Sequence, residues 1–169
     1  MTDSAVPTLR PATDDDGDAL ARLIAACFAE YPGCRFDRAT EFPELDAIAT
    51  HFAQQGGCMW VAEQGAGIVG CLGVRPTPAG SVELLKVYVA ADLRGSGLAR
   101  RLLSRAETFA AARQVDRIEL WSDTRFTRAH GFYAKHGFLD TGERRFLADL
   151  SDSWEARFVR PATLSAAAG

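Results

Sequence analysis

Apolar residues recur at helical spacing in some segments of this chain and form short strand-like runs in others. Apolar positions three and four residues apart predict amphipathic helices, and short apolar runs bounded by turn residues predict strands. The predicted helices cover 14–28, a segment that starts near Pro43, 98–110 and 125–136. The predicted strands cover 8–11, 58–63, 68–75, 82–89, 117–121, 138–146 and 154–160. This mixture favours an α+β layered domain.

Three of the predicted strands follow one another between the second helix and the third. The segment Gln64-Gly65-Ala66-Gly67 separates the first two of these strands and is a hairpin signal. The pattern therefore predicts an antiparallel meander. The chain contains no internal repeat and no linker, so we expect a single domain over 1–169, with its core at about 8–160 and a frayed tail at 161–169.

Composition and charge narrow the function classes. The 169 residues are 47% hydrophobic and 24% charged, which is typical of a folded globular chain. A net charge of -3 and a pI near 5.6 argue against a general nucleic-acid-binding protein. No apolar run reaches the ~18 residues of a membrane helix, and the first ten residues do not resemble a secretory signal. We therefore expect a cytoplasmic protein with neither nucleic-acid nor membrane partners.

Metal-ligating patterns are weak in this sequence. Aspartates at 14–16 could form a metal cluster, but after Thr13 they fit better at the capped start of a helix. The cysteines contain no C-x-x-C pair, and the three histidines do not complete a zinc pattern. We expect no metal, and reduced, mostly packed thiols at Cys27, Cys34, Cys58 and Cys71.

A glycine-rich turn carries the main chemical signal. The predicted strand 82–89 runs into Arg94-Gly95-Ser96-Gly97-Leu98-Ala99, which opens onto a long predicted helix. Backbone amides in such a turn, together with the positive end of the helix, can bind an anion such as a pyrophosphate. The turn is neither a Walker loop, because no Gly-Lys-Ser/Thr occurs, nor a Rossmann fingerprint, because Arg100 stands where the third glycine belongs.

Two local motifs occur in the sequence. The turn matches R/Q-x-x-G-x-G/A as Arg94-x-x-Gly97-x-Ala99, and 129–138 matches A-x-x-F-Y-x-K-x-G-F. Both motifs resemble those of the GNAT superfamily of acyl-CoA-dependent N-acetyltransferases. The order of the predicted elements agrees with that superfamily across about 8–160. The resemblance implies an α+β fold with a mixed, mostly antiparallel central sheet and helices on both faces. It also implies an enzyme that moves an acetyl group from acetyl-CoA to a primary amine by direct attack in a ternary complex.

The resemblance also implies which residues bind the cofactor. Backbone groups of Val87 and Val89 would pair with the pantetheine arm, and an N–H near Val87 or Tyr88 would stabilise the thioester oxygen. Amides of the glycine-rich turn would hold the pyrophosphate. These amides belong to Arg94, Gly95, Ser96, Gly97, Leu98 and Ala99.

Two side chains are candidates for proton transfer. Tyr133 stands where the superfamily commonly has the tyrosine that protonates the departing thiolate. Glu83 precedes Arg94 by the same offset as the catalytic glutamate of the histone-acetylating branch. An alkyl ammonium has a pKa of roughly 10 and must lose a proton before it attacks, which a carboxylate can accept. Without the resemblance, Glu83 fits a solvated edge or an ion pair equally well, and Tyr133 fits a packed aromatic.

Several alternatives stay open at this point. An acyl-CoA sensor or partner module of the same fold would need neither base nor acid, and a protein N-terminus or lysine could be the acceptor. The loop 30–41, the second helix and the connection 144–154 would select that acceptor, and a homodimer is possible. Two positions depart from the superfamily pattern: Phe126 replaces a common asparagine, and Gly131 lies inside the helix that presents Tyr133.

Overall fold

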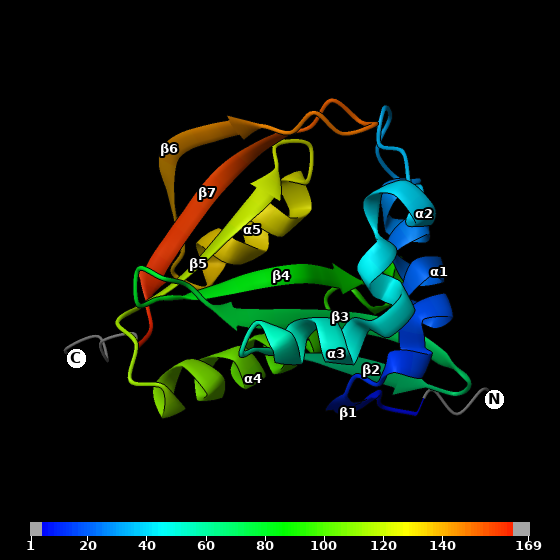
Figure 1. Cartoon of the computed structure of the whole chain (residues 1–169), viewed down its shortest axis with the longest axis horizontal. Helices are drawn as coiled ribbons and strands as arrows, with labels where there is room; N and C mark the ends of the chain where they lie inside the picture. Colours follow the sequence, from blue (N-terminus) through cyan, green and yellow to red (C-terminus); the bar gives the residue numbers. More distant parts are fainter. Residues whose placement is uncertain (1–4, 164–169) are drawn as a thin grey trace.

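A computed structural model of the protein describes residues 5–163. Within them, seven strands form one sheet in the order β1-β2-β3-β4-β5-β7-β6 (Figure 1). All neighbouring strands are antiparallel except β4 and β5, which are parallel. The mixed, mostly antiparallel sheet and its meander over β2, β3 and β4 are therefore confirmed. The strands are β1 (Thr8–Pro11), β2 (Cys58–Gln64), β3 (Gly67–Pro76), β4 (Val82–Val89), β5 (Arg117–Asp123), β6 (Leu139–Phe146) and β7 (Trp154–Pro161).

Helices cover both faces of the sheet, as expected. They are α1 (Gly17–Phe28), α2 (Arg38–Glu41), α3 (Ile48–Gln54), α4 (Leu98–Ala112) and α5 (Thr127–Lys135), with short 3-10 turns η1 (Asp14–Asp16), η2 (Pro43–Ala47) and η3 (Ala91–Leu93). Side chains of α4 and α5 pack in one core, and those of α1 and α3 pack in the other. Among residues 5–163, no helix is both long enough and apolar enough to cross a membrane.

Strand alternation distributes side chains between the two cores. On β3, Leu72 and Val74 point to the α4 side and Cys71 to the α1 side. The apolar stripe of α4 is buried as its spacing predicts, with Leu102 and Leu103 fully inside. Burial of such a leucine stabilises the fold by about 1.5–3 kcal/mol relative to leaving it exposed. These two cores fix the strands that carry the site.

Some predicted boundaries are wrong for local reasons. The helix predicted at 125–136 begins at Thr127, because Asp123 accepts hydrogen bonds from the backbone N–H and the guanidinium of Arg125 and holds a turn there. The helix predicted from Pro43 is a 3-10 turn followed by α3. The short helix α2 was not predicted, and its N-cap Asp37 accepts a hydrogen bond from the Thr40 N–H.

The structure tests two predictions made near the ends of the chain, the capped helix start at 14–16 and the frayed tail from 161. Asp16, in the acidic run, accepts hydrogen bonds from Arg10 at 2.8 Å and from the Thr13 N–H at 2.7 Å, so it caps the first helical turn. The frayed tail predicted from residue 161 is wrong at its start. Pro161 lies in β7, and the Ala162 N–H donates to the Asp116 carbonyl at 2.8 Å. The part of that prediction at 164–169 lies outside the described residues.

Candidate functional site

The strands β4 and β5 pair only at one end and then diverge (Figure 1). Their register joins Val82–Leu84 to Ile118–Leu120 and stops there. A cavity of about 510 Å³ and a second of about 260 Å³ border the gap that follows. Both cavities are lined by Val87, Tyr88, Phe126, Ala129 and Tyr133. The divergence of two parallel strands therefore creates a two-part site with a shared boundary.

A bulge in β4 shapes the free edge of this strand. Cys71 pairs with Tyr88 and Gly73 with Leu85, so Leu72 faces two residues of β4. Lys86, one of the two, has a φ of 52°, a conformation that costs a non-glycine residue of the order of 1 kcal/mol. Beyond the bulge, the Val89 carbonyl accepts a long hydrogen bond from the Arg94 guanidinium at 3.5 Å. This carbonyl therefore faces the first cavity and its cationic wall.

The glycine-rich turn presents free amides beside the first cavity. Gly95 and Gly97 have φ angles of 78° and 88°, which favour glycine. The N–H groups of Arg94 and Ser96 donate to backbone carbonyls of η3, and that of Leu98 donates to the Ser96 hydroxyl. Other amides of the turn and of the first helical turn have no acceptor among residues 5–163. These are the N–H groups of Gly95, Gly97, Ala99 and Arg100.

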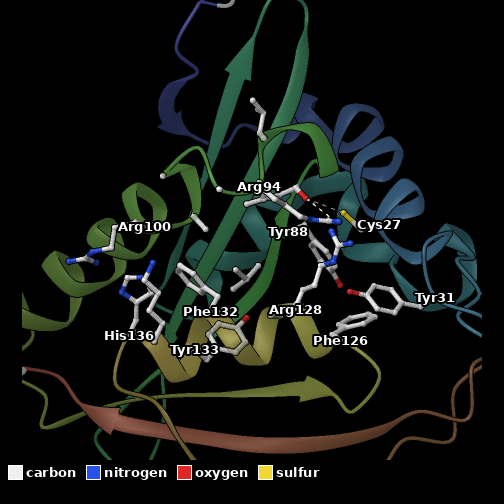
Figure 2. A pocket seen from close by; sticks show the side chains of 18 residues that line it. Cys27, Tyr31, Tyr88, Arg94, Arg100, Phe126, Arg128, Phe132, Tyr133 and His136 are labelled. Carbon is white, nitrogen blue, oxygen red and sulfur yellow. Dashed lines mark hydrogen bonds between the residues drawn. The ribbon is translucent and has the colours of Figure 1, made fainter.

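Cationic side chains surround the first cavity (Figure 2). Arg94, Arg100, Arg128 and Lys135 line it, and none of its described lining residues is a carboxylate. Arg94 is ion-paired with Glu30 of α1, and Arg100 is ion-paired with Glu107 of α4. Arg101 does not line the cavity, and its guanidinium binds the Pro7 carbonyl at 2.8 Å. The lining suits an anionic ligand.

Tyr133 lies at the boundary of the two cavities. Its side chain is 4% exposed and packs against Phe138 and Phe158 with ring centroids 5.6 and 5.8 Å away. Its hydroxyl makes no hydrogen bond within residues 5–163, and Figure 2 shows it turned toward the middle of the cavity. Burial raises the pKa of Tyr133, so the hydroxyl is protonated at neutral pH. The side chain is thus both a packed aromatic and a free proton donor.

Glu83 lines the second cavity and is 8% exposed. Its Oε2 accepts a hydrogen bond from Arg75 Nε at 2.9 Å, and Nη2 of the same arginine lies 2.8 Å from Oε2 in an ion pair. Arg75 is held in turn by Gln55, whose Oε1 accepts from Nη1 at 2.8 Å. Glu83 is therefore an ion-pair partner that also reaches the cavity. The structure brings it to the same cavity as Tyr133.

Sequence reasoning missed a row of charged residues that lines the second cavity. Asp123 on β5 lies opposite Glu155 on β7, and Glu155 lies opposite Arg145 on β6. Burial raises the pKa of Glu155, and the charges of Asp123 and Glu83 add to the rise, although Arg145 opposes it. Burial would raise the pKa of Asp123 as well, but hydrogen bonds from Arg125 lower it overall. The registers of β7 with β5 and with β6 bring these residues together.

The structure shows what surrounds the two positions that depart from the superfamily pattern, Phe126 and Gly131. Phe126 lines both cavities and packs on Tyr31 and Phe28, with ring centroids 4.9 and 5.9 Å away. An apolar aromatic wall therefore replaces an amide at this point. A Cβ added to Gly131 would meet nothing within 4 Å, so this glycine is not required by packing against a neighbouring strand.

Comparison with known sequences gives consistent matches. A sequence model of the acetyltransferase (GNAT) family matches residues 18–138. YjgM of Escherichia coli, an uncharacterized N-acetyltransferase, is 31% identical over 137 residues, which span 78% of this chain and 81% of YjgM. N-acetyltransferase 8B of Mus musculus is 29% identical over 104 residues, which span 59% of this chain and 45% of the mouse protein.

Solved structures share the fold. A GNAT-family acetyltransferase of Staphylococcus aureus has a TM-score of 0.79 at 20% identity, covering 93% of this chain and 99% of the other. The protein yncA of Salmonella typhimurium, solved with its cofactor acetyl-CoA, has a TM-score of 0.72 at 18% identity, covering 98% of this chain and 99% of the other.

Proposed function

Because the chain belongs to the GNAT acetyltransferase family, we propose that it transfers the acetyl group of acetyl-CoA to a primary amine by direct attack in a ternary complex. The observation that carries this proposal is the meeting of two cavities at Tyr133. The first cavity has a cationic lining, and the second contains five carboxylates among its lining residues. An anionic acyl donor and an amine can therefore approach the same point from different sides.

The first cavity fits the donor. Amides of Gly95, Gly97, Ala99 and Arg100 are free to bind the pyrophosphate oxygens at the positive end of α4. Within residues 5–163, the edge of β4 beyond the bulge has no strand partner on the β5 side, so Val87 and Val89 can pair with the amide groups of the pantetheine arm. When bound, acetyl-CoA supplies an acetyl group activated as a thioester.

Side chains of this protein then carry out the two proton transfers that the reaction needs. Glu83 accepts a proton from the ammonium form of the acceptor, directly or through a water, with the Oε1 oxygen that Arg75 does not bind. The neutral nitrogen forms a bond to the acetyl carbon as the carbon–sulfur bond breaks. The N–H of Val87 or Tyr88 stabilises the charge on the carbonyl oxygen. The sulfur takes the proton of the Tyr133 hydroxyl, and Tyr133 regains one from the solvent or the product.

The other readings of the site predict different behaviour. A sensor would bind acetyl-CoA without releasing thiol, and it would not require the free hydroxyl of Tyr133 at the junction. A protein acetyltransferase would accept a peptide amine in the second cavity, whose volume of about 260 Å³ admits a side chain or a terminus but no folded segment.

Thiol release tests the proposed function directly. The protein is incubated with acetyl-CoA and a panel of polyamines, amino acids, aminoglycosides and peptides, and free CoA thiol is measured with time. We expect amine-dependent release that saturates in both substrates. Acetyl-CoA binding with no amine-dependent release would support the sensor instead.

The Glu83→Gln variant should alter the acidic limb of the pH–rate profile. At low pH nearly all of the acceptor is protonated, so the loss of the base should lower kcat/KM by about 10². At high pH more of the amine is already neutral, and the loss should shrink. A Glu119→Gln variant is a suitable control, because Glu119 pairs with Glu83 in the sheet register but does not line either cavity. A Glu83→Gln profile that superimposes on the parent profile would leave the proton to another group.

A further inference from the structure

The second cavity has an excess of negative charge. Its described lining contains the carboxylates Glu41, Glu83, Asp123, Asp149 and Glu155 and the cations Lys86 and Arg145. Both of these cations already have a carboxylate partner, since Lys86 is paired with Glu44 and Arg145 with Glu155. An acceptor that carries a carboxylate would therefore have to displace an existing ion pair.

Three of the five carboxylates are paired with arginines, and the other two are not. Glu83 and Asp123 are paired with Arg75 and Arg125, which do not line the cavity, and Glu155 is paired with Arg145. Glu41 and Asp149 make no ion pair within residues 5–163. Glu41 accepts a hydrogen bond from the Leu150 N–H at 2.5 Å, and Asp149 accepts one from the Ser153 N–H at 2.8 Å.

These two carboxylates come from segments other than β4, β5 and α5, which carry the residues at the junction. Glu41 and Asp149 line the second cavity alone, whereas Tyr133 lines both. Glu41 ends α2 and binds the connection between β6 and β7, which meets the loop before α2 on the side away from β4 (Figure 1). Arg35 adds a second link, because its N–H donates to the Ser151 hydroxyl at 2.8 Å. Glu41 and Asp149 thus lie where two chain segments, 35–41 and 147–153, are held together by hydrogen bonds.

An unpartnered group at the boundary of the two cavities also points to a ligand. Tyr133 is 4% exposed and lines both cavities, yet its hydroxyl has no partner within the described chain. Glu83 and the row formed by Asp123 and Glu155 line the same second cavity as Tyr133. Asp123 and Glu155 lie directly opposite each other on β5 and β7, and each is paired with one arginine. A bound ammonium ion would add a further opposite charge beside these two carboxylates.

We propose that the acceptor is a compact amine with a second positive charge and no carboxylate. The reacting nitrogen lies beside Glu83 and Tyr133, and the second cation lies beside Glu41 and Asp149. The inference rests on the proposed function, because it assigns the acceptor of that reaction. The volume of about 260 Å³ is below the ~300 Å³ at which pockets for drug-sized ligands begin, so the acceptor is small.

Three four-carbon amines that differ only at the far end test this assignment. They are 1,4-diaminobutane, butylamine and 4-aminobutyrate, each assayed for thiol release with saturating acetyl-CoA. We expect kcat/KM for the diamine to exceed that for butylamine by about tenfold or more, since a charge-assisted contact is added. The aminobutyrate should be the poorest of the three.

Two variants locate the second charge. Glu41→Gln and Asp149→Asn keep an oxygen that can accept the backbone N–H but remove the negative charge. Together they should bring the ratio of diamine to butylamine close to one. Asp116→Asn removes an exposed charge outside both cavities and should leave that ratio and the activity unchanged.

The outcomes separate this inference from the proposed function. Thiol release with butylamine or aminobutyrate equal to that with the diamine would overturn the inference and leave the acetyltransferase standing. A lysine-containing peptide turned over faster than the diamine would also overturn it. Acetyl-CoA binding by calorimetry without thiol release for any amine would overturn both.

Discussion

Replacement of Tyr133 by phenylalanine should lower kcat by about 10² or more, the scale of general acid catalysis. The ring packs against Phe138 and Phe158, and phenylalanine preserves that packing. The hydroxyl has no partner within residues 5–163, so its loss leaves no buried group unpaired. The affinity for acetyl-CoA and the melting temperature should therefore change little.

Tyr88→Phe is the matched comparison. The Tyr88 ring also lines both cavities, and burial raises the pKa of Tyr88 as it does that of Tyr133. If Tyr133 is the donor, Tyr88→Phe should cost much less in kcat, measured under conditions in which chemistry limits the rate. A larger loss in Tyr88→Phe than in Tyr133→Phe would exchange the two roles.

The pH dependence gives a second check on the same hydroxyl. The pKa of Tyr133 is raised by burial, so the proton is present throughout the neutral range and up to at least the ordinary tyrosine value of about 10. The parent enzyme should accordingly show no loss of kcat on the basic side below that pH. A basic limb that falls near neutrality would indicate a different proton donor.

Local patterns sufficed to predict most of the fold. The spacing of leucines and alanines between Leu98 and Ala110 predicted α4, and each of the positions that it placed inside is buried, except Phe109, which is partly buried. The meander from Cys58 to Val89 followed from apolar runs and turn residues alone. Short helices such as α2 depend on a single N-cap, Asp37, and carry too little periodicity to predict.

The site was less accessible to sequence reasoning. The glycine-rich turn and Tyr133 stood out because each belongs to a local motif. The bulge at Lys86 depends on how β3 and β4 align, and no residue type marks it. Glu155 lies far along the chain from Asp123, and only the pairing of β5 with β7 places the two carboxylates in one cavity. Long-range register was therefore the missing information.

Replacement of Gly97 by valine should abolish most of the affinity for CoA. Gly97 has a φ of 88° at the N-terminus of α4, and a Cβ added there meets no atom within 4 Å. The side chain would therefore fill open space in the first cavity, in front of the free amides that are assigned to the pyrophosphate. Loss of these charge-assisted contacts should raise the Kd by about 10-fold to 100-fold in calorimetric titration.

A second glycine separates this effect from backbone strain. Gly80 has a φ of 78°, also faces open space and lies in the turn between β3 and β4, where it lines neither cavity. Gly80→Val and Gly97→Val should both lower stability by about 1–3 kcal/mol, because a β-branched residue is strained in the left-handed region. Only Gly97→Val should weaken CoA binding. Equal affinities in the two variants would place the pyrophosphate elsewhere, whereas a selective loss in Gly97→Val ties the ligand to the amides at the start of α4.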